Sequence, residues 1–452
     1  MRARSSWRIS LPAALLLGLL ICGCVVPRSG ARAFAGGDSL RANITKLLDV
    51  RIHGAGDAST PPILRVIDPA KPSNGGMGAS ALTLEFEIQS GSPPNLTLQL
   101  IHCDHNWVPT ENVFVQDPVR LSSSDFTIER SPIGVTHYDY LARITFPESN
   151  GRIVIEHSGN YLARVLDYYD RSKVLGQARF FAVESKASVG MDIASDFYES
   201  AQTTVLQHGL KIRVEAEPDY DLFSGQVEAI HLYRQGEWYS PLAADRMQEG
   251  SRAHGEPWIT FYPSFGSKAI AQYANVPSGN EHRLLDLSDL IYYPSTGNIV
   301  TTPLSDLPRR EFNQFDNGGV ALDRLIPTSD ADYVYFQFRL DLKGTAANED
   351  IFVVGTFNNW IPSSEWRMNY DKATGFYTAS GLLRRAVQEY QYVSGQWDEE
   401  TGTLRHADPT LLEGNLSTAS QSFFAFVYYK DISGGGFDRI VGAGVNTFGS
   451  IR

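Results

Sequence analysis

The densest group of chemically active side chains is the run His102-Cys103-Asp104-His105, with Trp107 close behind. Histidine, cysteine and aspartate are all common metal ligands. The run ends an alternating apolar segment, however, and side chains on a strand point to opposite faces in turn. At most two of the four can therefore converge, and no second cluster of Cys or His supplies the remaining ligands. We predict a strand end whose His and Asp hold a neighbouring loop by hydrogen bonds.

Other patterns that could support catalysis are absent from the chain. Cys103 is a lone thiol, which is usually buried as a small apolar side chain, although a metal site or a thiol nucleophile here is the alternative interpretation. No G-x-S-x-G elbow, H-E-x-x-H helix or Walker-type glycine loop occurs. Glu399 and Glu400 are adjacent, so we expect their side chains to splay apart, and Asp286 and Asp289 lack the spacing of a calcium loop. We predict no catalytic residue, no metal and no cofactor; a hydrolase with a dispersed active site is the alternative.

The elements that carry these residues are short alternating segments. Every second residue from 82 to 88 is apolar, which places Leu82, Leu84, Phe86 and Ile88 on one face of a strand. The pattern recurs, with turn signals between, over residues 96–101, 138–146, 153–156, 161–168 and 179–183. Six or so short strands within about 140 residues favour a β-sandwich.

Two further blocks follow the first. The second has clear strands at residues 210–216 and 227–233, and the third opens with the strongest alternation in the chain, residues 331–340. We predict an all-β protein of three β-sandwich domains in series, immunoglobulin-like or early-set-like. The expected domains are an N-terminal sandwich, a middle β-rich domain and a C-terminal early-set-like sandwich, over residues 46–185, 186–327 and 328–452.

Composition and charge exclude several classes of protein. With 42% hydrophobic residues the chain can bury a core, so wholesale disorder is excluded. Lys and Arg number 39 against 51 Asp and Glu, for a net charge of −12. Binding to a phosphate backbone depends on clustered cations. An acidic chain without a basic block is therefore not expected to bind nucleic acid.

The first residues are an export signal. Arg2, Arg4 and Arg8 precede an apolar stretch, residues 11–22, that is too short to span a bilayer. The ending Ile21-Cys22-Gly23-Cys24 resembles a bacterial lipobox, although Cys is unusual at its second position. We predict a lipoprotein signal peptide over residues 1–23, a lipidated Cys24 and a tether over residues 24–45. Ordinary signal cleavage beside two spectator cysteines is the alternative.

The C-terminal block contains the run Gly355-Thr356-Phe357-Asn358-Asn359-Trp360, and later Gly395-Gln396-Trp397 and His406-Ala407-Asp408-Pro409. This ordered set resembles the glycogen-binding and early-set modules of starch-active proteins. The resemblance implies a sandwich in which Trp360 and Trp397 stack on glucan rings. The basic residue that commonly precedes the second tryptophan is missing. The alternative is that Trp360 packs the sandwich edge and Trp397 lies in a loop.

The whole chain, over about residues 50–445, resembles a more specific family, the plug proteins of the Bacteroidetes type IX secretion system. The motifs that carry this resemblance are residues 102–109, 159–162, 279–283, 330–335 and 354–360, and the C-terminal strand with Phe437-Asp438-Arg439-Ile440-Val441-Gly442. The chain departs from the family pattern at residues 223–226 and 235–238. Both departures lie in the second domain, so the resemblance does not establish the contacts that this domain makes.

The resemblance implies a non-enzymatic periplasmic protein at the inner face of the outer membrane. It would bind the giant outer-membrane β-barrel translocon, plug its periplasmic side and meet other envelope secretion components. Trp238, Tyr239 and Tyr262 are expected in sandwich cores, with contacts to the barrel as the alternative role. The competing hypothesis is an envelope glycan-binding lipoprotein that uses Trp360 and Trp397.

Overall fold

The structure is a computed structural model that describes residues 45–66, 76–147, 152–246, 255–309, 332–344 and 346–449. The signal peptide, Cys24 and all of the tether except its last residue lie outside the described residues. The described elements are almost all strands, which confirms the predicted all-β class. None of the described helices is long and apolar enough to cross a membrane.

The N-terminal sandwich has one sheet of its own. Its strand order is β1-β3-β7-β6, with β1 (Lys46–Gly54), β3 (Leu82–Gln89), β7 (Tyr140–Phe146) and β6 (Thr127–Arg130). The predicted inner face of β3 is confirmed, since Leu82, Leu84, Phe86 and Ile88 are all fully buried. They pack against apolar side chains of the facing strands, among them Leu98 and Phe180.

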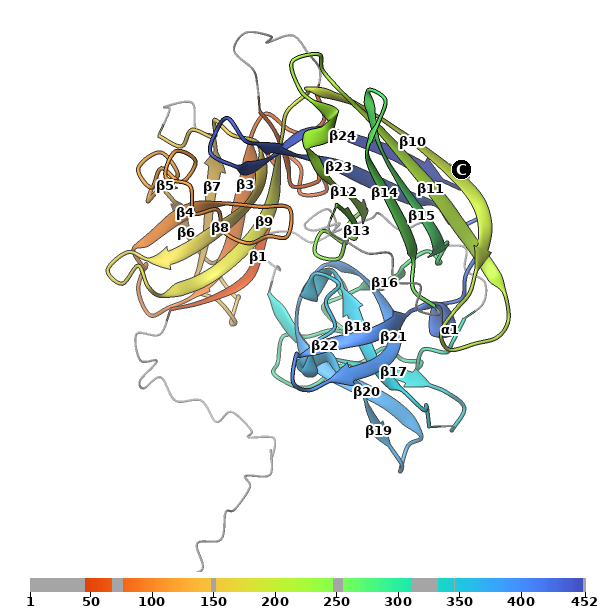
Figure 1. The fold of residues 1–452 in the computed structure, drawn as a ribbon. Helices are drawn as coiled ribbons and strands as arrows, with labels where there is room; N and C mark the ends of the chain where they lie inside the picture. Colours follow the sequence, from red (N-terminus) through yellow and green to blue (C-terminus); the bar gives the residue numbers. More distant parts are fainter. Residues whose placement is uncertain are drawn as a thin grey trace, which may run out of the picture. The chain divides into compact units, whose positions relative to one another are not determined.

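The facing sheet extends well beyond the N-terminal domain. Its path is β13-β12-β23-β24-β9-β8-β4-β5, with β2 paired to β9. The strands are β2 (Ile63–Arg65), β4 (Leu96–Cys103), β5 (Ser122–Ser123), β8 (Gly159–Asp167), β9 (Val174–Val183), β12 (Val227–Arg234), β13 (Leu242–Asp245), β23 (Gln421–Asp431) and β24 (Phe437–Phe448). Figure 1 shows the blue pair β23 and β24 beside the green strand β12. One continuous sheet therefore joins the N-terminal and central parts of the chain.

The central sandwich is completed by a second, four-stranded sheet. Its order is β10-β11-β15-β14, with β10 (Ala187–Tyr198), β11 (Gln207–Pro218), β15 (Lys268–Pro277) and β14 (Trp258–Phe265); the 3-10 turn η1 (Ser224–Gln226) precedes β12. Ile212 and Tyr273 of this sheet share a buried cluster with Ile230 and Val427 of the large sheet. The two sheets are thus held together by an apolar core.

The C-terminal part has two small sheets, β16-β21-β18 with β22, and β17-β20-β19. Their strands are β16 (Arg283–Asp286), β17 (Tyr333–Asp341), β18 (Asp350–Gly355), β19 (Asn369–Asp371), β20 (Phe376–Arg384), β21 (Val387–Asp398) and β22 (Thr403–Asp408). The short elements are η3 (Thr356–Asn358), η4 (Ser364–Trp366) and α1 (Thr410–Glu413). Phe336 and Phe338 of one sheet share a core with Val353 and Tyr392 of the other.

The sheet topology differs from three sandwiches strictly in series. Strands β23 and β24 were placed in the block 328–452, but they pair in the large sheet between β12 and β9. Strand β16 was placed in the middle block, yet it pairs with β21. Alternation identifies a strand but not its partner, because pairing depends on contacts far apart in sequence. Residues 423–429 are apolar or aromatic without a break and are all buried, as in a strand covered on both faces.

The position of β23 and β24 predicts the effect of a truncation. A chain ending at Gly414 lacks both strands, so it exposes the edges of β12 and β9 together with their apolar faces. We expect it to lose cooperative urea unfolding and to aggregate, as followed by circular dichroism and size-exclusion chromatography. A chain ending at Gly449 is the control and should behave like the full chain. A monomeric Gly414 variant with the parent's unfolding midpoint would contradict the topology.

Candidate functional site

The run His102–Trp107 lies where β4 ends and the chain turns. The amide N–H groups of Asn106 and Val108 both donate to Oδ1 of Asp104 over 2.9 Å. The turn is closed by the Trp107 N–H, which donates to the Asp104 carbonyl over 3.0 Å. Asp104 therefore acts as a turn-forming side chain.

His102 is completely buried beneath this turn. Its Nδ1 lies 2.8 Å from Oγ1 of Thr110, and its Nε2 lies 3.1 Å from the carbonyl oxygen of Ser158. Gly159 has φ +147, and a Cβ there would lie 2.2 Å from the His102 Nε2. Only glycine fits at this position. Burial lowers the pKa of His102 to about 4, so the ring is neutral at pH 7.

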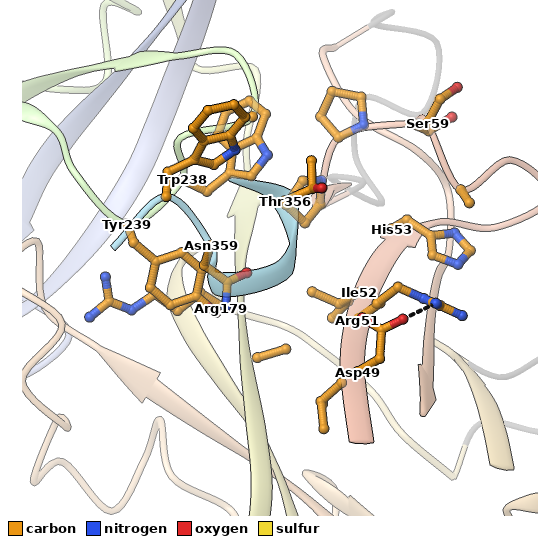
Figure 2. A pocket seen from close by; sticks show the side chains of 18 of the residues that line it. Asp49, Arg51, Ile52, His53, Ser59, Arg179, Trp238, Tyr239, Thr356 and Asn359 are labelled. Atoms are coloured by element: carbon orange, nitrogen blue, oxygen red, sulfur yellow. Dashed lines mark hydrogen bonds and ion pairs between the residues drawn. The ribbon is translucent and has the colours of Figure 1, made fainter. Parts of the chain in front are cut away.

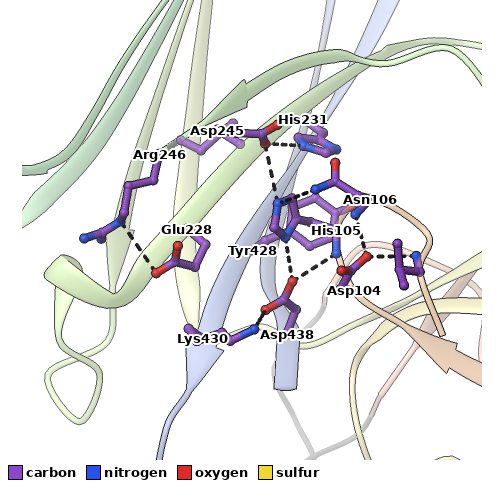
Figure 3. Close-up of polar contacts among 12 residues, drawn as sticks. Asp104, His105, Asn106, Glu228, His231, Asp245, Arg246, Tyr428, Lys430 and Asp438 are labelled. Carbon is purple, nitrogen blue, oxygen red and sulfur yellow. Dashed lines mark hydrogen bonds and ion pairs between the residues drawn. The ribbon is translucent and has the colours of Figure 1, made fainter. Parts of the chain in front are cut away.

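His105 lies in a network that joins the first sandwich to the central strands (Figure 3). Its Nδ1 lies 2.6 Å from Oδ2 of Asp438, and Oδ1 of Asp438 accepts from Nζ of Lys430 over 3.0 Å. On the other side, His231 Nε2 lies 2.7 Å from Oδ1 of Asp245. Burial opposes ionisation of Asp438, but bonds to His105 and Lys430 prevail and lower its pKa to about 2. Burial likewise opposes protonation of His105, and Asp438 outweighs it and raises the His105 pKa.

Two more side chains extend this joint. Asn160 donates from Nδ2 to the Asp104 carbonyl, and its Oδ1 accepts from the hydroxyl of Tyr428, each over 2.9 Å. The Trp107 indole N–H donates to the hydroxyl of Tyr233 over 3.4 Å. The run His102–Trp107 thus contacts β12, β23 and β24. The predicted role of its His and Asp side chains, which is to hold a loop by hydrogen bonds, is confirmed.

The remaining residue of the run, Cys103, is fully buried and forms no disulfide. Burial raises the pKa of its thiol to about 12, so almost no thiolate exists at pH 7. Within the described ranges, no three His, Cys, Asp or Glu side chains are grouped to hold a metal ion. The geometry of the run is therefore that of a structural joint.

A pocket of about 310 Å³ lies close to this joint. Figure 2 shows Asp49, Arg51, Ile52 and His53 of β1 on one side and Trp238, Tyr239, Arg179, Thr356 and Asn359 on the other. The guanidinium carbon of Arg179 lies 4.4 Å from the ring centre of Trp107 and 4.6 Å from that of Tyr239. The pocket is therefore lined by aromatic rings on one wall and by ionised groups on the other, and its volume is at the lower end for small-molecule sites.

Comparison with known proteins identifies the part of the chain that contains the joint. Residues 71–184 match the family model described as Type 9 secretion system plug protein 1st domain. The chain carries the first domain of the type IX secretion plug family. This confirms the family predicted from the sequence and ties the protein to the type IX secretion system and to the cell envelope. No curated protein matches the chain.

Solved structures add information about the fold. A crystal structure of a hypothetical protein from Parabacteroides merdae ATCC 43184 matches with a TM-score of 0.66 and 17% identity, covering 89% of this chain and 97% of that chain. A biofilm-associated protein BSP domain has a TM-score of 0.16 and 9% identity over 94% of this chain and 62% of that one. A marsupial T cell receptor has a TM-score of 0.15 and 9% identity, covering 89% of this chain and 100% of that chain. Scores as low as the last two carry no argument.

The two tryptophans predicted to stack on glucan lie together in a small core, beside the pocket that Trp360 helps to line. Trp360 is 5% exposed, and its ring centre is 4.0 Å from that of His282. Trp397 packs on Phe352, with 5.0 Å between the two ring centres. Stacking on a sugar needs a flat exposed face, and Trp360 offers none. Of the three aromatics expected in cores, Trp238 packs against a buried cluster, whereas Tyr262 is exposed.

Sequence reasoning missed a second joint, between the plug domain and the C-terminal part. Glu87 is fully buried, accepting from Nε of Arg384 and from the hydroxyl of Tyr333, each over 2.9 Å. Nearby, Asp332 Oδ1 lies 2.9 Å from Nδ1 of His137. Alternation puts Glu87 on the face opposite Phe86 and Ile88, and the pattern contains no signal that this face is also covered. The motif that includes Asp332 and Tyr333 was the only sequence signal for this contact.

The buried His102 predicts a pH dependence of stability. The pKa of the His102 ring is near 6.5 in the unfolded chain and about 4 in the folded chain. The unfolded state therefore holds more protons between these values, and stability falls as the pH drops. We expect His102 to account for a loss of about 2 kcal/mol between pH 7.5 and pH 5.

The measurement is the free energy of unfolding in urea at both pH values for the parent and for His102→Gln. The variant should be less stable at pH 7.5 but should lose about 2 kcal/mol less than the parent on acidification. His406→Gln, at an exposed histidine, is the matched control and should keep the parent's dependence. An unchanged pH dependence in His102→Gln would show that the ring is not held neutral.

Proposed function

We propose that this protein is a non-enzymatic component of the type IX secretion system that binds the outer-membrane β-barrel translocon and plugs its periplasmic side. The observation that carries the proposal is the plug-family first domain at residues 71–184. Its last strand, β9, continues into the central sheet, where Val183 pairs with Ile440 of β24. The plug domain is therefore built into a larger body.

A plug has to resist deformation, and the buried polar joints supply stiffness. His105 and Asp438 join the plug domain to the central strands, and Glu87 and Arg384 join it to the C-terminal part. Removing one partner of a buried ion pair costs roughly 3–5 kcal/mol, because the other charge is left without compensation. A substitution of one of these four side chains is therefore expected to destabilise the joint to which it belongs.

The chemistry of the described residues supports a binding role over an enzymatic one. The reactive types in the strongest motif are committed to structure: His102 is buried and neutral, Cys103 is a buried thiol and Asp104 forms a turn. A protein that closes a pore requires shape and contact surface, and no bond-breaking group.

The competing function is glycan binding in the envelope. The aromatic wall of the pocket, with Trp238, Tyr239 and Trp360, is the feature that favours it. The pocket is small, however, and Trp360 is covered by His282. Retention on immobilised glucan would support this alternative, and we expect none.

We further propose that Cys24 is lipidated and attaches the protein to the periplasmic face of the outer membrane. The support is the arginine-rich start, the short apolar stretch and the Ile-Cys-Gly-Cys ending. Mass spectrometry of the N-terminal peptide from native membranes should find a chain that begins at an acylated Cys24. An unmodified peptide that begins elsewhere, for instance after Ala35, would contradict lipidation while leaving export intact.

Deletion of the gene tests the plug function in cells. A translocon that passes folded cargo is wide, so loss of its plug should admit large polar antibiotics or dyes that the outer membrane normally excludes. Growth on starch or glycogen should be unchanged. The Trp360→Ala, Trp397→Ala double variant, if stably folded, should restore the barrier as the parent does. Unchanged permeability and secretion together with failed growth on glucan would contradict the plug and favour the glycan-binding alternative.

A further inference from the structure

Four loops from distant parts of the sequence meet at one end of the central sandwich. Val227 pairs with Tyr429, which places the β11–β12 connection beside the β23–β24 turn. The hydroxyl of Ser224 lies 3.5 Å from the Gly266 carbonyl oxygen in the β14–β15 turn. From the plug domain, Asn112 donates its Nδ2 hydrogen to the Gly434 carbonyl over 2.9 Å. We call residues 108–119, 219–223, 265–267 and 431–436 together the apolar end.

The apolar end exposes large side chains that would ordinarily be buried. Each of the following is at least 65% exposed: Val113, Phe114, Tyr220, Phe223, Phe265 and Ile432. Single exposed apolar residues are ordinary, but a group gathered from several loops marks an interaction site. Four of the six are aromatic, the residue class that most often anchors protein interfaces.

The loop that carries Phe114 is held in place by hydrogen bonds. Asn112 accepts from the Phe114 N–H through Oδ1 over 2.9 Å, while its Nδ2 binds Gly434. Gln116 donates from Nε2 to the His102 carbonyl over 2.7 Å. A loop that is already ordered loses little conformational entropy when a partner binds. The exposed phenylalanine is thus presented in a defined position.

Charge distinguishes between two kinds of partner. The four segments contain five acidic residues and no Lys or Arg: Glu111, Asp117, Asp219, Asp221 and Asp431. Three of the acids pair with bases outside these segments: Asp117 with Arg120, Asp221 with Lys186 and Asp431 with Arg439. An anionic membrane surface attracts basic segments and repels acidic ones. Acids around apolar anchors instead fit a protein cleft rimmed by Lys or Arg.

We propose that the apolar end docks into an apolar, basic-rimmed cleft of a protein partner. This inference rests on the proposed function, which makes the partner the periplasmic face of the secretion barrel. Phe114 and Phe223 fill pockets of the cleft, and Glu111 meets its basic rim. The contact therefore uses the plug domain and the central sandwich together, held in register by the bond between Asn112 and Gly434.

The test measures affinity of the full chain for the purified, detergent-solubilised barrel of the source bacterium. The Phe114→Ser, Phe223→Ser double variant should bind at least about tenfold more weakly, as expected for loss of two anchors. Glu111→Lys should weaken binding severalfold and reduce its salt dependence. The matched control is Phe197→Ser: Phe197 is 70% exposed but pairs with His208 at the opposite end of β10. It should bind like the parent, and all variants should unfold at the parent's urea midpoint.

The outcomes separate this proposal from the proposed function. If the parent does not bind the barrel, both fail. If the parent binds and the double variant binds equally well, or Phe197→Ser weakens binding as much, the apolar end is overturned while the plug function stands. Binding to phosphatidylethanolamine–phosphatidylglycerol vesicles tests whether the partner is a membrane. This experiment is done in a Cys24→Ser background, because that substitution removes the N-terminal lipid. Vesicle binding that the two Phe→Ser changes abolish would overturn the protein partner in favour of a membrane.

Discussion

The insertion of the β23–β24 pair between β12 and β9 is the contact on which the rest of the structure depends. It makes one sheet of strands from the plug domain, the central region and the C-terminal end of the chain. The start of β24 also supplies Asp438, whose charge is compensated by His105 and Lys430. Next to it, Arg439 pairs with Glu184, just beyond the last strand of the plug domain. The Asp438 carboxylate, at 1% exposure, is tolerated in the core only with such partners. The pairing of β24 beside β9 therefore depends on these ion pairs, and the ion pairs form only when β24 is in place.

The sequence was informative wherever the decisive contacts are local. Alternation over residues 82–88 predicted both the strand β3 and its buried face, because the side-chain period of a strand is two. It could not reveal that Glu87, on the other face, meets Arg384 almost three hundred residues later. The run 423–429 likewise indicated a strand without indicating its sheet. Pairing partners are set by long-range packing, which leaves no periodic signal within one segment.

The same division applies to the candidate site. Lone thiol character and strand alternation predicted a buried Cys103 and a hydrogen-bonded role for its neighbours. Nothing in the run indicated Asp438 or Tyr428 as partners, since both lie on strands more than three hundred residues away. Exposure was the least predictable property. Trp360 sits in a motif typical of sugar-stacking modules but is buried, whereas Phe114 and Phe223, of a residue type that is usually buried, are exposed.

A plug is defined by closure of a channel, so the most direct measurement is flux through the barrel itself. The purified barrel would be placed in vesicles loaded with a large polar dye, and the full chain added to the side that carries the barrel's periplasmic face. Saturating protein should reduce dye release to that of vesicles without barrel, and addition to the opposite side should have no effect. Barrel-dependent release that persists while the protein is demonstrably bound would contradict a plug and leave only a binding role in secretion.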